Sequence, residues 1–442
     1  MSRSSTEQAA LQWSHIEDVL SGRHEGQEVH LRGWVHRWRE QGKLVFLTLR
    51  DSTGVLQCTI KKGALPDDQF EDAKRANLLE SSVEVHGAAK KDPRAPGGWE
   101  VQATGFRAIH VGDVFPITEN QSVEFLLDVR HLWLRSQYLT KVMKVKHVML
   151  TAMRDHLNTH GWYETTPSVI TPIAGEGGST LFDFKYFEQK AFLSQTAQMY
   201  LEVLMFGLER VYSVTPSFRA EKSRTTRHLA EFTHLEAETA WFGQEENLKL
   251  QEGLVEHAVQ ACVQKVPHLL KDLGRDPDDL KGVKAPFPRM DYGEVIEKLQ
   301  DLGEKISWGE DFGAPQERLL TEKMKVPVFV TNFPKEIKAF YMKVDPAKPD
   351  TVICADLLAP EGYGEIIGGS VREENNDLLI ERLKKEGANL KNYEWYLDLR
   401  RYGSIPHAGF GLGVERVLQW IVKGEHIRDM TPFPRTMSRA YP

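Results

Sequence analysis

The segment "FRAEKSRTTRHLAEFTHLE", residues 218–236, concentrates positive charge: four Lys/Arg and two His occupy its nineteen positions. The strand-like run "VYSVTPSFRAE" leads into the polar "KSRTTRHLA", and "EFTHLEAETAW" resumes the strand pattern, which predicts a hairpin with a cationic tip. One guanidinium can bind two oxygens of a phosphate at once. Arg219 and Arg227, with the imidazole of His228, could therefore span a triphosphate. A charged surface loop would have the same composition.

The composition of the whole chain is that of a globular protein with two or three domains, since 41% of its 442 residues are hydrophobic. A net charge of -7 gives no general attraction to nucleic acids or anionic membranes, so any polyanion must bind a local patch. Cys58, Cys262 and Cys354 lie far apart among apolar residues, as expected of buried free thiols in a reducing compartment. The first residues contain no signal-peptide core and no stretch approaches a membrane span, so we expect a cytoplasmic protein without membrane contact.

Residues 1–113 are expected to form an N-terminal extension followed by a small β-barrel. Five short β runs are broken by Gly, Asp and Pro: "VHLRGWV", "KLVFLTLRD", "VLQCTIKKG", "SSVEVHGAAKK" and "WEVQATGFRAIHVG". Residues 114–137 are expected to be a linker. Residues 138–442, a long mixture of predicted helices and strands, are expected to contain the chemistry.

One face of the predicted barrel suits unpaired bases. Alternation leaves Phe46 of the second run and Gln57 of the third on the outside, opposite their aliphatic neighbours. Residues 29–63 also carry seven Lys/Arg against two acids. An exposed aromatic among cations is typical of single-stranded nucleic-acid binding, although a solvated strand face would give the same pattern.

The C-terminal stretch "IPHAGFGLGVERVLQWIV" favours a ligand site over a plain charged loop. Gly409, Gly411 and Gly413 let the backbone pass close to a ligand before a helix opens, and Arg416 lies in the first turn of that helix. Val414 stands where a dinucleotide fingerprint has its third glycine, and the chain contains neither a P-loop nor an HExxH pattern.

Three stretches, in order, carry a resemblance to a known family: "HGWYETTPSVITP", then "FRAE" to "HLAEFTHLEAE", then "GFGLGVER". They resemble the three signatures of class II aminoacyl-tRNA synthetases. With the barrel reading "LRGWVHRWREQGKLVFLTLRDSTGVLQ", the chain resembles the aspartyl/asparaginyl subgroup over nearly its full length. The resemblance implies an α+β protein, with an N-terminal OB-fold barrel that binds the anticodon and a catalytic domain built on an antiparallel β-sheet flanked by helices.

The resemblance implies that ATP and Mg²⁺ are used. Arg219 would hold the α-phosphate and the amino-acid carboxylate, Phe232 would stack on adenine, and Arg416 would bind the γ-phosphate. The other ATP-binding residues implied are Glu221, Arg227, His228, Gly411 and Gly413. Asp356 and Glu365 match the magnesium carboxylates, and Mg²⁺ prefers such hard oxygen ligands.

The amino acid would bind at the other end of the same pocket. Glu176, in the glycine-rich "GEGGSTLF", would pair with the α-ammonium of the substrate, and Ser194, Gln195 and Gln198 would line the same end. Leu201 stands where aspartyl enzymes carry a lysine that neutralises the substrate carboxylate. Arg372 matches an arginine directed at the side-chain oxygen, and Glu236 stands where aspartyl relatives have an aspartate. An amide is therefore favoured over a carboxylate, because Glu236 accepts from NH₂ and repels a like charge.

Within the subgroup the chain most resembles the asparaginyl enzymes, so we predict asparagine and tRNA(Asn) as substrates. The alternatives are an aspartyl enzyme, possibly one that does not discriminate between tRNAs, an ammonia-dependent asparagine synthetase with the same catalytic fold, and a non-catalytic RNA-binding relative. The resemblance also implies a homodimer through the first signature. The anticodon residues implied are Arg39, Phe46, Gln57 and Glu80.

Overall fold

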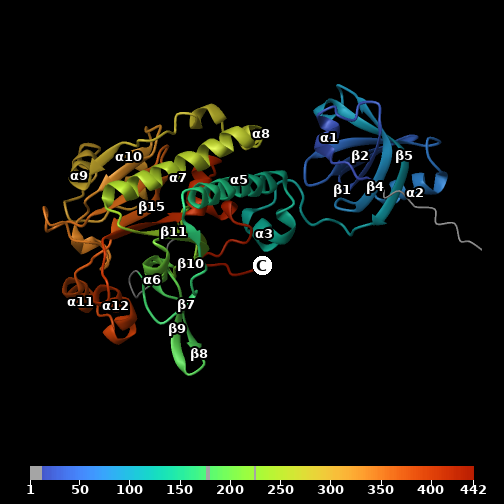
Figure 1. Cartoon of the computed structure of the whole chain (residues 1–442). Helices are drawn as coiled ribbons and strands as arrows, with labels where there is room; N and C mark the ends of the chain where they lie inside the picture. Colours follow the sequence, from blue (N-terminus) through green and yellow to red (C-terminus); the bar gives the residue numbers. More distant parts are fainter. Residues whose placement is uncertain (1–11, 176–179, 223–224) are drawn as a thin grey trace, which may run out of the picture. The chain divides into compact units, whose positions relative to one another are not determined.

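The computed structural model describes residues 12–175, 180–222 and 225–442, which divide into two compact units, 1–123 and 124–442 (Figure 1). The smaller unit is a closed barrel with strand order β1-β2-β3-β5-β4, as predicted. Its elements are α1 (Ile16–Leu20), β1 (Glu28–Gln41), β2 (Leu44–Arg50), β3 (Val55–Lys61), α2 (Asp67–Arg75), β4 (Ser82–Lys91) and β5 (Trp99–His110).

Alternation along the strands of the barrel sets its inside and outside. Val45, Leu47 and Leu49 are fully buried, whereas Phe46 between them is only half-buried. On β3 the buried Leu56 and Cys58 flank the half-buried Gln57, as the period of two requires.

The larger unit is built on an eight-stranded, mainly antiparallel sheet of order β12-β13-β14-β15-β16-β11-β10-β6. Its strands are β6 (Tyr163–Glu164), β10 (Arg210–Phe218), β11 (Glu231–Ala240), β12 (Arg289–Asp291), β13 (Val328–Thr331), β14 (Cys354–Ala359), β15 (Gly364–Val371) and β16 (His407–Gly413). A small sheet of order β7-β9-β8 stands beside it, formed by β7 (Ile170–Thr171), β8 (Asp183–Tyr186) and β9 (Gln189–Leu193).

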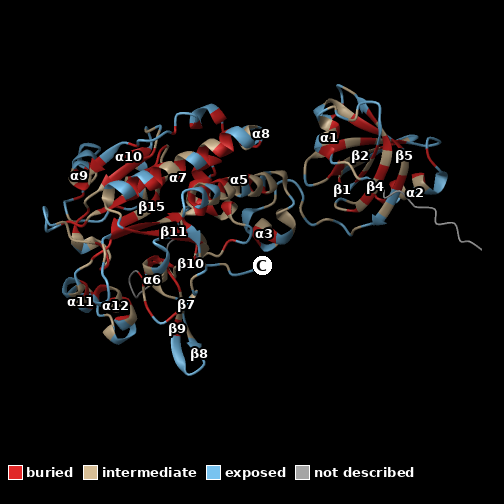
Figure 2. Ribbon diagram, viewed as in Figure 1, coloured by how far each residue is buried: buried red, intermediate tan, exposed pale blue. Residues whose placement is uncertain are grey.

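Two long helices cover one face of the large sheet, α5 (Gln137–Thr159) and α7 (Gln244–Lys265), and they lie side by side in Figure 1. The remaining helices are α3 (Val123–Asp128), α4 (Arg130–Trp133), α6 (Gln198–Leu208), α8 (Pro267–Asp272), α9 (Tyr292–Asp301), α10 (Ala314–Thr321), α11 (Asn376–Lys385), α12 (Glu394–Arg401) and α13 (Val414–Ile421). Figure 2 shows the buried residues concentrated in the sheet and on the inner sides of these helices. None of the helices in the described part of the chain combines the length and the apolar character needed to cross a membrane.

The boundary between the units differs from the expected linker of residues 114–137. Residues 124–137 belong to the larger unit, and they contain helical turns where the sequence indicated a connection. The fully buried Arg130 fixes them there: its guanidinium donates to the carbonyl oxygens of Pro432, Arg428 and Thr431. These partners lie about three hundred residues away along the chain, so local sequence carries no sign of the contact.

Candidate active site

The hairpin predicted from residues 218–236 is formed by β10 and β11, which pair antiparallel from Arg210↔Thr239 to Phe218↔Glu231. Along β11, Leu235 and Ala237 point into the core beneath the helices. His234, Glu236 and Glu238 therefore point to the opposite face. On that face lies a cavity of ≈ 600 Å³, which His234 and Glu236 help to line.

The three glycines of β16 make room for these side chains. Register places Gly413, Gly411 and Gly409 opposite the three residues His234, Glu236 and Glu238. A Cβ added to Gly411 would lie 2.4 Å from Nε2 of His234, and one added to Gly409 would lie 2.2 Å from the Glu238 carboxylate. From the sequence we expected these glycines to let the backbone approach a ligand. In the structure Gly409 and Gly411 instead make room for the side chains of Glu238 and His234 on the neighbouring strand.

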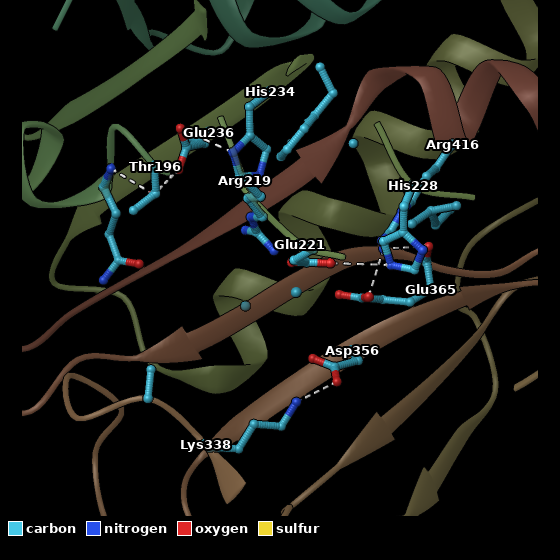
Figure 3. Close-up of a pocket in the computed structure, with 18 of the residues that line it drawn as sticks. Thr196, Arg219, Glu221, His228, His234, Glu236, Lys338, Asp356, Glu365 and Arg416 are labelled. Carbon is cyan, nitrogen blue, oxygen red and sulfur yellow. Dashed lines mark hydrogen bonds and ion pairs between the residues drawn. The ribbon is translucent and has the colours of Figure 1, made fainter. Parts of the chain in front are cut away.

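One end of the cavity is rich in guanidinium groups. The Arg219 guanidinium lies 5.5 Å from the centre of the Phe232 ring. Arg416 donates to Oε2 of Glu365 at 2.7 Å, and Arg227 donates to the backbone oxygen of Glu365 at 2.9 Å. Cationic groups from two signature segments therefore converge on one residue, Arg416 on the carboxylate of Glu365 and Arg227 on its backbone oxygen; the close-up in Figure 3 shows Arg416 and Glu365.

His228 lies beside this cluster, with Nε2 3.7 Å from Oε2 of Glu221 (Figure 3). Burial, together with the positive charge of Arg416, lowers the pKa of His228 below its ordinary value. At neutral pH the imidazole is therefore uncharged and suited to hydrogen bonding rather than to neutralising a phosphate.

Asp356 and Glu365 lie on the adjacent strands β14 and β15. A Cβ added to Gly368 would lie 3.3 Å from Oε1 of Glu365 and 3.5 Å from Oδ1 of Asp356, so these two oxygens converge over the same point. The other Asp356 oxygen accepts from Lys338 at 2.5 Å. Within the described residues no three His, Cys, Asp or Glu are grouped to hold a metal. The two converging carboxylate oxygens are of the hard kind that Mg²⁺ prefers, so their chemistry is compatible with that ion.

The opposite end of the cavity is formed by Thr196, Gln198, Glu236 and Arg372. The Glu236 carboxylate accepts from the Thr196 hydroxyl and from the backbone N–H of Ala197 at 2.7 Å. Arg372 donates through both Nε and Nη2 to the Glu238 carboxylate, in a fully buried fork. Burial opposes the charge on Arg372, but Glu238 outweighs it and raises the pKa of the guanidinium.

Comparison with known proteins identifies the family of the chain. Residues 122–437 match the family described as tRNA synthetases class II (D, K and N), and residues 29–109 match the OB-fold nucleic acid binding domain. The chain belongs to the class II aminoacyl-tRNA synthetases. It is 54% identical over 418 residues to the asparagine--tRNA ligase of Thermococcus gammatolerans, across 95% of this chain and 97% of that protein. It is 45% identical over 427 residues to the ligase of the same name from Thermoplasma acidophilum, across 97% and 99%.

Among solved structures, the synthetase is similar to asparaginyl-tRNA synthetase from Pyrococcus horikoshii complexed with asparaginyl-adenylate. The TM-score is 0.94 at 49% identity, over 98% of this chain and 100% of that one. An asparaginyl-tRNA synthetase from Entamoeba histolytica, also complexed with asparaginyl-adenylate, superposes with a TM-score of 0.86 at 32% identity, over 95% and 97%. The family resemblance and the α+β fold expected from the sequence are confirmed.

The cavity of this synthetase brings together most of the predicted site residues. All eight residues assigned to ATP line it, as do the two carboxylates assigned to magnesium and three of the seven residues assigned to the amino acid: Arg219, Glu221, Arg227, His228, Phe232, Gly411, Gly413, Arg416, Asp356, Glu365, Gln198, Glu236 and Arg372.

The other four residues assigned to the amino acid are placed differently. Glu176 lies outside the described residues. Leu201 is fully buried in an apolar cluster with Met205 and Val211, away from the cavity lining. Gln195 accepts from the backbone N–H of Gly175 at 3.2 Å and donates to the Thr180 hydroxyl at 2.7 Å, so it anchors the two flanks of the glycine-rich segment.

Ser194 also lies outside the lining, because its hydroxyl donates to the backbone oxygen of Thr196 at 2.6 Å. The structure adds residues to the cavity that the sequence did not single out, notably Thr196, His234 and Lys338. The alternation in "HLEAE" puts His234 on the same face of its strand as Glu236. Together with the alternating glycines of "GFGLG" on the paired strand, this pattern could have predicted that His234 lines the cavity. Lys338 reaches Asp356 only through folding and had no such signal.

In the barrel, three of the four predicted anticodon residues share the outer surface of neighbouring strands. Arg39 on β1 pairs in register with Phe46 on β2, and its guanidinium lies 5.1 Å from the ring centre. Gln57 on β3 donates to Glu100 at 3.1 Å. Glu80 instead forms a 2.7 Å ion pair with Arg50, in which both side chains are largely buried.

Proposed function

We propose that this synthetase ligates asparagine to tRNA(Asn) through an asparaginyl-adenylate, consuming ATP and releasing AMP and pyrophosphate. The observation that carries the proposal is the amino-acid end of the cavity. There the carboxylate of Glu236 faces inward and the charge of Arg372 is already matched by Glu238. A carboxamide can donate N–H to Glu236, whereas the carboxylate of aspartate would meet a like charge.

The first step is an in-line attack by the substrate carboxylate on the α-phosphorus of ATP, with pyrophosphate as the leaving group. Arg219 orients the attacking carboxylate and the α-phosphate, and Arg416 holds the γ-phosphate. Phe232, half-buried on β11, stacks on the adenine. The substrate supplies the nucleophile, so the protein contributes positioning and charge stabilisation rather than a nucleophilic side chain.

Asp356 and Glu365 would hold Mg²⁺, which neutralises charge on the phosphates when bound. Lys338 supplies a further cation close to them. Burial lowers the stability of its charged form, but Asp356 outweighs that effect and raises the pKa of Lys338. In the second step the terminal ribose hydroxyl of tRNA takes the aminoacyl group and AMP leaves.

The deciding experiment is ATP–pyrophosphate exchange with asparagine and with aspartate. Asparagine is expected to support the faster exchange, by about a hundredfold or more, because leaving a charge unpaired costs several kcal/mol. Faster exchange with aspartate would reverse the assignment. Free asparagine formed from aspartate and ammonia would identify an asparagine synthetase instead.

The proposal extends to assembly and location. Two copies are expected to pair through the first signature, which contains the edge strand β6 with Tyr163 59% exposed, and the complex is expected to act in the cytoplasm. Sedimentation of Tyr163→Asp against wild type tests the pairing. A wild-type protein that sediments as a monomer would contradict it.

A further inference from the structure

A buried group of polar side chains lies behind the amino-acid end of the cavity and has no part in the chemistry described so far. At its centre is Glu202 on α6, whose side chain is fully buried. Its carboxylate accepts from Arg400 at 2.9 Å and from the Tyr396 hydroxyl at 2.9 Å, and Nε2 of His407 lies 3.1 Å away. These partners come from α12 and β16, so the group ties three elements together.

Glu202 also accepts from a residue that lines the cavity. Gln198 lies four residues earlier on α6, on the same side of the helix, and its Nε2 donates to Oε1 of Glu202 at 3.0 Å. Burial alone would raise the pKa of Glu202, but Arg400 and His407 outweigh it and hold that pKa below its ordinary value. The carboxylate is therefore ionised and accepts hydrogen bonds only.

An acceptor-only partner fixes which end of an amide turns toward it. The NH₂ group of Gln198 is held toward Glu202, so the oxygen on the other branch of the amide is the end presented to the cavity. The backbone is fixed at the same place, because the N–H of Gln198 donates to the Thr196 hydroxyl oxygen at 3.1 Å. Glu236 already supplies an acceptor for the carboxamide, which leaves the Gln198 oxygen for the other N–H group of the substrate.

We propose that Glu202 is a positioning residue, which holds the amide of Gln198 so that its carbonyl oxygen accepts from the α-ammonium of the amino acid. The inference rests on the proposed function, since it takes asparagine as the ligand. Leu201, the neighbouring position where aspartyl enzymes carry a lysine, acts in this account only through packing. The next residue on α6, Glu202, instead orients the polar group that faces the substrate, the amide of Gln198.

The test compares two ligands, asparagine and succinamate, which is asparagine without its amino group. In Glu202→Gln the new amide can donate to the Gln198 oxygen, so the Gln198 amide is free to turn its NH₂ group toward the cavity. We expect the Kd of asparagine, measured by calorimetry, to rise about tenfold to a hundredfold, the range of a hydrogen bond to a charged group. The Kd of succinamate is expected to stay within about twofold.

Two further variants separate orientation from stability. Gln198→Glu combined with Glu202→Gln exchanges the two groups, restores an acceptor facing the cavity, and is expected to recover the preference for asparagine over succinamate. Gln198→Leu leaves Arg400, Tyr396 and His407 in place around the Glu202 carboxylate. It is expected to lose that preference with a Tm close to wild type, so it decides the role of the Gln198 oxygen even where Glu202→Gln fails to fold.

An equal loss for both ligands in Glu202→Gln, or no loss of preference in Gln198→Leu, would overturn the inference. Wild-type protein that binds asparagine more weakly than aspartate would instead defeat the proposed function, and the two failures are thereby distinguishable.

Discussion

Arg416 on α13 and Glu365 on β15 form an ion pair at the phosphate end of the cavity, with Nη1 and Oε2 2.7 Å apart. Burial works against the ionised carboxylate, but Arg416, Lys338 and Arg227 outweigh it and lower the pKa of Glu365 to about 2. The same contact therefore orients the guanidinium and keeps Glu365, the proposed magnesium ligand, ionised throughout the physiological range.

Replacing Arg416 should remove the charge proposed to hold the γ-phosphate, which leaves as part of pyrophosphate. Arg416→Ala is expected to lower kcat/KM for asparagine-dependent pyrophosphate exchange by about 100- to 1000-fold, as loss of one preorganised electrostatic donor does elsewhere. Arg401→Ala is the matched control, because Arg401 pairs with Asp398 on the surface and such pairs contribute little. Equal exchange rates in the two variants would contradict the assignment of Arg416.

Gly411 and Gly413 both line the cavity, and substituting alanine at each tests whether crowding by a new Cβ destabilises the fold. Gly411→Ala would bring its Cβ to 2.4 Å from the His234 ring, whereas in Gly413→Ala the nearest contact is 3.4 Å, to Arg416. We expect Gly411→Ala to lower the free energy of unfolding by about 1–3 kcal/mol through overpacking, and Gly413→Ala to change it by much less. Urea denaturation measures both, and a larger loss in Gly413→Ala would show that the crowding is not the cause.

The sequence predicted the features that depend on local pattern. The hairpin of β10 and β11, the five strands of the barrel and the helix that begins at Val414 follow from periodicity and from the positions of glycine. The sequence could not show that Arg130 ties the expected linker to the larger unit, because that contact spans about three hundred residues. The family resemblance, rather than a local pattern, placed Leu201 at the substrate; in the structure its side chain lies in an apolar cluster with Met205 and Val211.

The burial of Leu201 leads to a prediction about engineered specificity. Leu201→Lys would place a charge among Ala197, Met205 and Val211, and an ion removed from water costs several kcal/mol unless it is paired. We therefore expect a large fall in Tm and no gain of aspartate-dependent exchange. Leu201→Met, which preserves volume and polarity, is expected to cost less than about 1.5 kcal/mol. A stable Leu201→Lys variant that activates aspartate would show that this position reaches the substrate.

Phe46 and Arg39 lie together on the outer face of the barrel, so their contribution should be confined to tRNA. Phe46→Ala is expected to weaken tRNA charging by about 1–3 kcal/mol, the value of one base stacked on an aromatic ring, with asparagine activation unchanged. Ile109→Ala, another exposed apolar residue of the same unit, serves as the control. Equal losses in charging and in activation would argue against stacking.

His156 on α5 provides a prediction about stability that does not depend on the substrate. Its ring packs on Gly253 of α7, where an added Cβ would lie 3.2 Å away, and its centre is 4.5 Å from the His160 ring and 5.4 Å from the His257 ring. Burial, with the two neighbouring imidazoles, lowers the pKa of His156 from 6.5 to about 4.

Between these two values the unfolded chain binds a proton at His156 that the folded protein does not. The contribution of His156 to stability is therefore complete above pH 6.5 and is lost as the pH falls toward 4. We expect the fall in Tm between pH 7 and pH 4.5 to be smaller for His156→Gln than for wild type. His131 is exposed, so His131→Gln serves as the control, whose Tm should fall as that of wild type does. A parallel fall in Tm for wild type and His156→Gln would mean that His156 titrates alike in the folded and unfolded states, which the packing of its ring against α7 argues against.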